Sequence, residues 1–406
     1  MKQITELLKE RKQRGYAIAQ TQKVVQKGEA WLVPSETNPH KTYQVVLKLE
    51  GSTCSCEDFL GRGIKCKHQF AVELTITKQI NKDGSTTITQ TNKVSYPQNW
   101  KAYNLATSQQ KELFLKLFND LCNTIEEKEY TFGRPSMPMR DMVFASGLKV
   151  FTTFSLRRFK SDSKEAQGKG YMVKSPDYST VAKYMESEEM TPILKEILGI
   201  SALPLRSVED NSFSIDSSGF SPHKFSRWYD YKWGKERNKK LFYKAHLLIG
   251  NNTHIICGAE ITTQFVADPV MLPKLVKEVN RNFDVRELDG DKAYSSRDNL
   301  TLLDKLGIVP YIPFKSNSVK KPKGSRIWRD MYNYFTYNRE AFLESYHQRS
   351  NIETAFFMIK SKFSDYVRSK NDTACINEIY LKLICHNLCC VIQETFELGI
   401  QANFTQ

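Results

Sequence analysis

The chain has 406 residues, of which 40% are hydrophobic and 26% charged, so it is long and apolar enough to form two or three packed domains. This composition excludes a disordered or fibrous protein. The formal net charge of +14 favours an anionic partner such as nucleic acid, although charge alone does not establish one.

Neither a membrane helix nor an export signal is expected. The apolar stretch 379–400 is interrupted by Lys382, His386, Asn387 and Glu394, and no segment has the roughly 18 uninterrupted apolar residues of a membrane helix. The first residues lack a signal-peptide hydrophobic region. We therefore expect no membrane partner, a cytoplasmic location and nine reduced cysteines.

Residues 1–100 show the alternation and turn signals of a small β-rich module. Strands are expected over 43–49, 74–80 and 85–90. The segment 81–84, Asn-Lys-Asp-Gly, is a typical hairpin turn between the last two.

Four metal-ligand residues lie between these strands. Cys54 and Cys56 are separated by one residue, and Cys66 and His68 follow after nine more. Three thiolates and one imidazole complete a tetrahedral Zn²⁺ site without an open position, which indicates a structural zinc. The flanking basic residues are compatible with phosphate contacts and equally with simple solvation: Arg62, Lys65 and Lys67.

Residues 101–205 have helical apolar spacing and are expected to form a helical domain for DNA binding or dimerisation. The segments 113–121 and 142–159 are its apolar helices. The segment 178–185 fits either the recognition helix of a helix-turn-helix motif or a helix packed on the core, and packing is the better interpretation.

Residues 366–406 are expected to form a C-terminal helical segment. Cys385, Cys389 and Cys390 lie on its apolar helix and are interpreted as buried small hydrophobes. The neighbouring His386 leaves a metal site as the weaker alternative.

Residues 206–365 alternate between strand and helix patterns. Three strands in succession, followed by helix–strand–helix–strand, predict a mixed sheet covered by helices, and thus an α/β domain. The expected strands are around 213–215, 242–250, 254–261, 283–288 and 308–314, and the expected helices are 268–279 and 297–306.

Three acids of this domain are candidate metal ligands. Asp216 is expected at the end of the first strand, Asp291 just past a later strand, and Glu353 on a helix. Three carboxylates at one sheet edge can hold two divalent cations, one activating the attacking water or 3′-hydroxyl and the other stabilising the leaving oxygen. Oxygen ligands favour Mg²⁺ or Mn²⁺ over zinc. The alternative is that they are ordinary acids that cap turns and helices.

Four polar residues form a stripe on the helix that carries Glu353. Tyr346, Arg349, Glu353 and Lys360 fall within roughly 60° of one another at helical spacing. A carboxylate between two cations and a phenol suits a site that holds metal ions and a phosphate backbone together. A solvated salt-bridge stripe is the alternative, because Arg349 and Glu353 are four residues apart.

In order and spacing, this stripe resembles the signature of the DDE transposases of the insertion-sequence-four group of bacteria and archaea. Ile215-Asp216-Ser217 resembles their first-acid motif, and Asp291-Lys292-Ala293-Tyr294 resembles the second. The stretches 244–246 and 312–315 are also similar to the family, and the resemblance covers about 208–363.

The resemblance implies a ribonuclease-H-like catalytic domain with Asp216, Asp291 and Glu353 as catalytic residues on two Mg²⁺ or Mn²⁺ ions. It also implies DNA contacts by the other three stripe residues. Asp289 competes with Asp291 for the ligand role, and Asp291 fits the family pattern better. A small basic insertion is expected at about 315–340, where Trp328 is a candidate for stacking on a flipped base.

The cysteine cluster and the apolar residues after it resemble the SWIM zinc finger, a module that binds DNA or protein partners. Together the resemblances imply an enzyme that cuts transposon ends and joins them to target DNA in a cut-and-paste reaction. Its expected partners are double-stranded DNA and a second copy of the chain on that DNA, in association with the nucleoid. The alternative is an inactive, transposase-derived regulator that binds DNA or, through the SWIM module, another protein.

Overall fold

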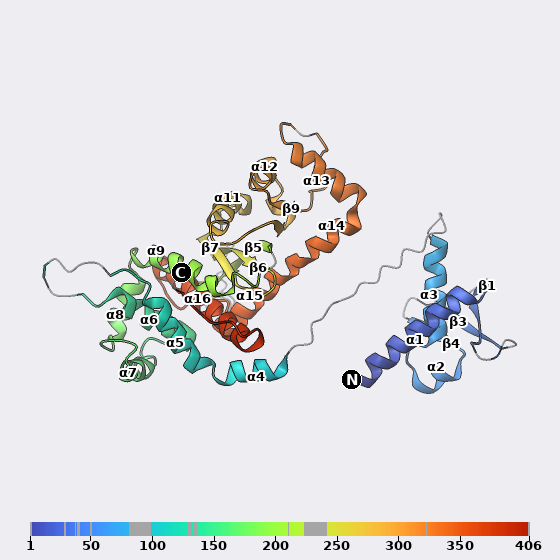
Figure 1. The fold of residues 1–406 in the computed structure, drawn as a ribbon, viewed down its shortest axis with the longest axis horizontal. Helices are drawn as coiled ribbons and strands as arrows, with labels where there is room; N and C mark the ends of the chain where they lie inside the picture. Colours follow the sequence, from blue (N-terminus) through green and yellow to red (C-terminus); the bar gives the residue numbers. More distant parts are fainter. Residues whose placement is uncertain are drawn as a thin grey trace, which may run out of the picture. The chain divides into compact units, whose positions relative to one another are not determined.

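The computed structural model describes residues 2–27, 30–36, 38, 41–48, 51–80, 99–127, 132–133, 136–209, 211–222, 242–321 and 323–404. The chain divides into two compact units, Met1–Tyr96 and Pro97–Gln406 (Figure 1).

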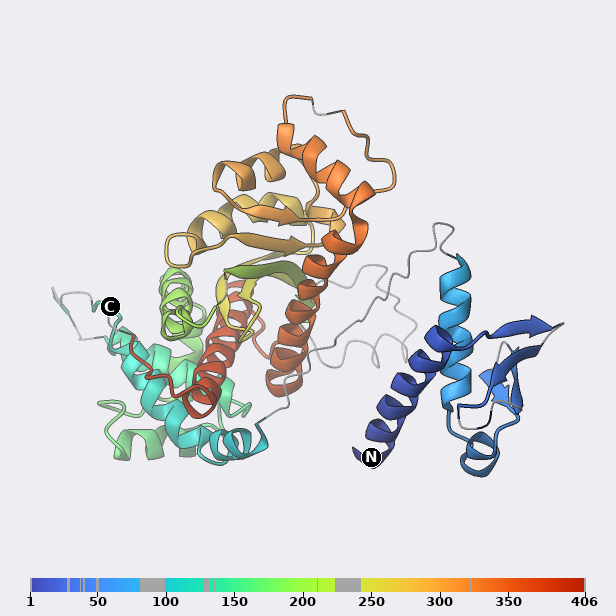
Figure 2. The same cartoon turned by 45° about the vertical axis from the view of Figure 1, so that its right-hand side comes forward.

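The first unit is a four-stranded antiparallel sheet of order β1-β2-β3-β4, with α3 packed on it and α1 packed along α3 (Figure 2). Its core contains Trp31, Val33, Val45, Ala71 and Val72 together with the cysteine cluster. The elements are α1 (Lys2–Thr21), β1 (Val25–Lys27), β2 (Ala30–Pro34), β3 (Thr42–Lys48), β4 (Gly51–Cys54), α2 (Glu57–Arg62) and α3 (Lys67–Ile80).

The close crossing of α1 and α3 requires Gly15. A Cβ atom at this position would lie 2.7 Å from the carbonyl oxygen of Lys67 and 2.6 Å from the Cβ of Phe70. Both distances are shorter than van der Waals contact, so a larger residue would push the helices apart. The metal-ligand candidate His68 lies in the same turn of α3 and would move with it.

The strand expected over 74–80 is wrong, because these residues continue α3. The prediction rested on the β-branched residues Thr75, Ile76 and Thr77, which favour strands when considered alone. Packing of α3 against α1 overrides that preference. The predicted turn 81–84 and strand 85–90 lie outside the described residues.

The second unit is built on a five-stranded mixed sheet of order β7-β6-β5-β8-β9. The β5–β6 and β6–β7 pairs are antiparallel, whereas β5–β8 and β8–β9 are parallel. The expected mixed sheet with flanking helices is confirmed. The strands are β5 (Ser212–Phe220), β6 (Tyr243–Gly250), β7 (Ile256–Thr263), β8 (Glu287–Gly290) and β9 (Val309–Tyr311).

Helices cover both faces of this sheet, and each face has its own core (Figures 1 and 2). Leu247 and Ala259 pack with α5, α6, α9, α15 and α16, whereas Ile215 and Leu248 pack with α11, α12 and α13. The helices are α4 (Trp100–Ser108), α5 (Gln110–Cys122), α6 (Met139–Phe151), α7 (Lys160–Gly168), α8 (Tyr178–Met185), α9 (Met190–Ala202), η1 (Leu203–Leu205), α11 (Asp268–Val279), η2 (Lys292–Tyr294), α12 (Arg297–Lys305), α13 (Arg326–Tyr337), α14 (Arg339–Tyr346), η3 (His347–Arg349), α15 (Ser350–Phe363) and α16 (Asp372–Glu397).

The helical segment before the sheet shares one core with α16 and α15. Helix α8 has the predicted bounds, and its Val181 and Met185 are buried against that core, which supports the packing interpretation over a recognition helix. Helix α16 is long and apolar enough to span a membrane, but 89% of its most apolar window is buried inside the protein. It is thus the central helix of this core, and Cys385 and Cys390 on it are buried.

Two strands are shorter than expected. Residues 283–286 precede β8 as irregular chain, although Phe283 and Val285 are buried in the core. Similarly, β9 ends at Tyr311 while Ile312 and Phe314 remain buried. Apolar residues just before or after a strand can be buried in the core without forming the hydrogen bonds of the sheet. The apolar pattern of the sequence alone does not distinguish such residues from those of the strand itself.

Candidate active site and metal centre

Asp216 lies on the central strand of the mixed sheet. It occupies the middle of β5 rather than the predicted end, because the strand continues to Phe220. Its Oδ1 accepts a hydrogen bond from the Ser217 N–H at 2.8 Å, and its Oδ2 accepts one from Arg349 Nη2 at 2.8 Å. Burial raises the pKa of Asp216, although Ser217 and Arg349 oppose the rise.

The parallel pairing of β5 and β8 brings Asp291 beside Asp216. Ile215 is opposite Gly290 in this ladder, so the residue that follows each lies at the same level of adjacent strands. In addition to burial, the charge of Asp291 raises the pKa of Asp216. These two acids therefore share one electrostatic environment.

Arg349 links the third acid to the first. Its Nη1 donates to Glu353 Oε1 at 2.8 Å, while its Nη2 donates to Asp216 Oδ2 at the same distance. One guanidinium thus lies between carboxylates from β5 and from the first turn of α15. Glu353 remains largely exposed and accessible to a ligand.

The polar stripe is not one continuous α-helix. Tyr346 ends α14, Arg349 ends the 3₁₀ turn η3, and Glu353 and Lys360 lie on α15. Lys360 Nζ donates to Ser218 Oγ at 2.6 Å, two residues after Asp216 on β5. Burial raises the pKa of Tyr346, with contributions from the charges of Asp291, Asp216 and Glu353. All four stripe residues therefore remain near the acids.

Among the described residues, the group of His, Cys, Asp and Glu side chains placed closely enough to hold one metal ion is Cys54, Cys56, Cys66 and His68, and the three acids do not form such a group. A guanidinium already occupies the space between two of them. The site nevertheless fits divalent cations, because it holds a positive group between two carboxylates and offers oxygen ligands of the kind that Mg²⁺ and Mn²⁺ prefer.

Asp289 lies in a different environment. It is 1% exposed, and its Oδ2 accepts a hydrogen bond from Asn251 Nδ2 at 3.2 Å. Burial raises the pKa of Asp289 to about 8, so the carboxyl is protonated at neutral pH. An uncharged, buried carboxyl is a poor cation ligand, and the geometry favours Asp291 over Asp289.

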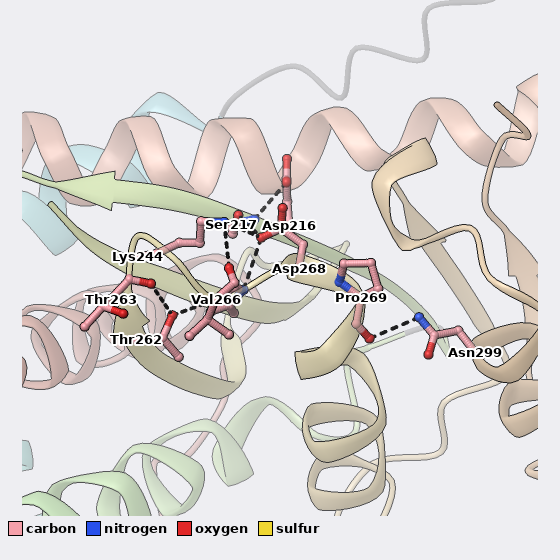
Figure 3. Close-up of polar contacts among 10 residues, drawn as sticks. Asp216, Ser217, Lys244, Thr262, Thr263, Val266, Asp268, Pro269 and Asn299 are labelled. Atoms are coloured by element: carbon pink, nitrogen blue, oxygen red, sulfur yellow. Dashed lines mark hydrogen bonds and ion pairs between the residues drawn. The ribbon is translucent and has the colours of Figure 1, made fainter. Parts of the chain in front are cut away.

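A fourth carboxylate near the acids was not identified from the sequence. Asp268, in the first turn of α11, accepts hydrogen bonds from Ser217 Oγ at 2.7 Å and Lys244 Nζ at 3.0 Å (Figure 3). His246 Nδ1 lies 3.4 Å from the same oxygen. Although burial would raise it, Ser217 and Lys244 keep the pKa of Asp268 below its usual value. The sequence did contain one sign of this group, because Lys244 and His246 alternate along β6 and therefore lie on one face of the strand, where both contact Asp268.

Trp328, the candidate for base stacking, is part of the core. It is 4% exposed, its Nε1 donates to the carbonyl of Val319 at 2.9 Å, and its ring lies edge-on to Phe314 at 4.8 Å. A side chain held in this way is not available to stack on DNA.

The cysteine cluster of the first unit forms a closed, buried ligand group. The sulfur and nitrogen atoms of Cys54, Cys56, Cys66 and His68 all lie within 4.8 Å of one another. His68 Nδ1 is 3.9 Å from Cys54 Sγ and 3.8 Å from Cys66 Sγ. Sulfur and nitrogen ligands at about 2.0–2.3 Å from one tetrahedral ion have separations of this order, so the residues fit a structural zinc.

Three acids beside a mixed α/β sheet, with basic side chains next to them, are an arrangement typical of proteins that act on phosphodiesters with divalent cations. Comparison with protein families agrees with this class: residues 209–388 match the transposase DDE domain, and residues 43–76 match the SWIM zinc finger. The chain therefore carries a transposase DDE domain preceded by a SWIM zinc finger. No solved structure matches the chain.

Proposed function

We propose that the protein is an active DDE transposase that cleaves the ends of transposon DNA and transfers them to target DNA. The observation that carries this proposal is that the guanidinium of Arg349 lies between Asp216 and Glu353, while the charge of Asp291 acts on Asp216.

Asp216, Asp291 and Glu353 would bind two Mg²⁺ or Mn²⁺ ions. When bound, these ions activate the attacking water or 3′-hydroxyl and stabilise the leaving oxygen. Asp216 holds its carboxylate in a fixed orientation, because Ser217 N–H occupies one of its oxygens. Glu353 is exposed on α15 and would be the third ligand of the set.

The basic residues of the stripe would hold the DNA. Arg349, once released from the acids, offers a planar pair of donors that matches a phosphate. Lys360 is held beside Ser218 on β5 and supplies a second positive charge next to the acids. Tyr346 is positioned to contact the DNA end. The net charge of +14 adds sequence-independent attraction to DNA.

The SWIM module would bind one zinc ion through Cys54, Cys56, Cys66 and His68 and would contact DNA or a protein partner. Transposition joins two ends, so we further propose that two copies of the chain act together on DNA. The location that follows is the nucleoid of the cytoplasm.

The test is a DNA cleavage assay with Mg²⁺, in which the substrate carries the inverted repeats that flank the gene. It compares the wild-type chain with the variants Asp216→Asn, Asp291→Asn and Glu353→Gln. We expect each substitution to abolish cleavage while end binding persists, because removing one ligand disrupts the two-cation site. Asp289→Asn is the matched control and should retain cleavage. A fully active Glu353→Gln protein would refute the assignment of the triad, and wild-type protein that binds the ends without cutting them would indicate the inactive regulator instead.

A further inference from the structure

A cavity of about 350 Å³ lies between the helical segment that precedes the sheet and the chain that follows α15. Its walls carry three basic side chains, Lys149, Arg368 and Lys370. Another part of its lining is apolar and includes Leu156, Ala182 and Met185. None of the three acids or the four stripe residues lines the cavity, so it is separate from the candidate active site.

Lys149 is a buried cation whose hydrogen-bonding capacity is unused. It is 4% exposed, and its Nζ lies 3.6 Å from Glu378 Oε2, which is longer than a hydrogen bond. Among the described residues, the oxygens of Glu378 accept their hydrogen bonds from Arg368 N–H and from the N–H and Oγ of Ser369 instead. An ammonium has three N–H donors, so Lys149 can still bind an anion that enters the cavity.

The chain segment that carries the other two cations is held in place by α16. Glu378 accepts the N–H groups of Arg368 and Ser369 at 3.0 Å each, and Lys382 Nζ donates to the carbonyl of Ser364 at 3.0 Å. The side chains of Arg368 and Lys370 are exposed and have no ion pair within the described part of the chain. Buried charges on α16 therefore fix the backbone and leave these two cations available to an external ligand.

This segment runs on from the strand that carries Asp216. Val367 N–H donates to the carbonyl of Ser221 at 2.9 Å, directly after the end of β5, and Arg368 is the next residue. Asp216 and Ser221 are five residues apart, about 16 Å along an extended chain. One turn of duplex DNA is about 34 Å long. The cavity is thus within one helical turn of a DNA end bound at the acids.

We propose that this cavity binds a phosphate group of the DNA backbone, as a second anchor apart from the stripe. The proposal rests on the proposed function. Lys149 and Arg368 bind the phosphate oxygens, and the apolar lining contacts the neighbouring deoxyribose, which inorganic phosphate lacks. Glu186 also lines the cavity and repels a doubly charged free phosphate more strongly than a singly charged phosphodiester.

The test measures how tightly the zinc-loaded full chain binds a labelled transposon-end duplex, by fluorescence anisotropy at several salt concentrations. Arg368→Met should bind about 10-fold more weakly and lower the slope of log affinity against log salt by about one, because one phosphate contact is lost. Arg368 is preferred to Lys149, since Lys149→Met would leave the buried Glu378 without its cation.

Two further variants show whether the cavity itself is the site. Ala182→Leu fills the apolar lining without changing any charge, so it should also weaken binding, because the phosphate group is excluded. Arg206→Met is the matched control: this arginine is exposed, precedes β5 and lines no part of the cavity, and its loss should leave the affinity unchanged. Thermal melting checks that each variant is folded.

Three results would overturn the proposal. If wild type binds and cuts the end and Arg368→Met has the same affinity and salt slope, the cavity does not bind DNA and the proposed function stands. If Arg368→Met weakens binding but Ala182→Leu does not, Arg368 acts from the surface and the cavity is not the site. If Arg368→Met abolishes calorimetric binding of inorganic phosphate but leaves DNA binding unchanged, the cavity is a site for a free anion.

Failure of the proposed function gives a different pattern. A wild-type chain that binds the end with the expected dependence on Arg368 and Ala182 but does not cut it would refute the catalytic function and support the cavity as a DNA anchor.

Discussion

Arg349 Nη2 lies 2.8 Å from Asp216 Oδ2, and this ion pair joins the segment before α15 to the central strand of the mixed sheet. The second nitrogen of the same guanidinium reaches Glu353. Two acids that would bind divalent cations are therefore neutralised by a side chain of the chain itself. A divalent cation at the proposed site would compete with Arg349 for the same carboxylate oxygens, so Arg349 would have to move when the cation binds.

Arg349→Met should destabilise the cation-free chain by about 1–3 kcal/mol, because two carboxylates lose their charged partner. Added Mn²⁺ should restore most of the loss, since it neutralises the same acids. The measurement is urea unfolding with and without Mn²⁺. Arg329→Met is the control, because the Arg329–Asp330 pair is exposed and contributes little. If Arg349→Met loses the same free energy of unfolding with and without Mn²⁺, the proposed competition between Arg349 and the cation is contradicted.

Asp289→Asn should change the pH dependence of stability. The pKa of Asp289 is raised to about 8 by burial, whereas an aspartate in the unfolded chain titrates near about 4. Between these values the unfolded chain releases a proton that the folded chain keeps, so this group lowers the stability of wild type as pH rises. The asparagine variant does not titrate at this position, so its stability relative to wild type should rise between pH 4 and pH 8, by up to about 5 kcal/mol at about 1.4 kcal/mol per pKa unit.

Urea unfolding of both proteins at a series of pH values measures this gain. Asp284→Asn, at an exposed aspartate paired with Arg286, is the matched control and should show no comparable gain. A constant difference between Asp289→Asn and wild type across the range would show that Asp289 is ionised in the folded chain.

Lys360→Met should weaken DNA binding and reduce the slope of log affinity against log salt by about one, as expected for the loss of one phosphate contact. Lys362→Met is the control on the same helix, because its Nζ is exposed and contacts Gln110, away from the acids. The measurement is fluorescence anisotropy with a labelled transposon-end DNA at several salt concentrations. It compares the salt slopes of the Lys360→Met and Lys362→Met variants. Equal slopes for Lys360→Met and wild type would assign Lys360 to the surface salt-bridge alternative.

Cys66→Ser should remove zinc and unfold the first unit, because so small a core depends on the bound metal. The second unit has two cores of its own and should remain folded. Zinc content by elemental analysis and limited proteolysis measure both effects, and Cys389→Ser in the second unit is the control. Freshly purified wild type with less than half a zinc ion per chain would contradict the zinc site.

The parts of the fold that contain sequence motifs could be predicted, because the spacing of the motif residues is fixed by the metal ion or the hydrogen bond that they serve. Cys54, Cys56, Cys66 and His68 need a fixed spacing to surround one ion, and the structure brings them together. The start of α12 was also predictable, since Ser296 accepts a hydrogen bond from the Asn299 N–H as an N-cap.

The contacts between distant elements could not be predicted in this way. Residues 74–80 have strand propensity but belong to α3, a helix that packs as a whole on α1. The ion pair of Arg349 with Asp216, and the network of Asp268 with Ser217 and Lys244, join segments far apart in the chain. No local pattern encodes such pairs, because they depend on strand register and on how α11 and α15 meet the sheet.

The parallel ladder between β5 and β8 would also set when the proposed DNA cleavage activity appears during folding. Parallel partners meet only after a long crossover has been synthesised and closed, and contacts distant in sequence form slowly. Glu353 follows later still, on α15. Under the proposed function, a partly folded chain would carry basic residues that attract DNA before its three acids are assembled. Its first contacts with DNA would then be harmless, and cleavage would appear last, as a property of the finished fold.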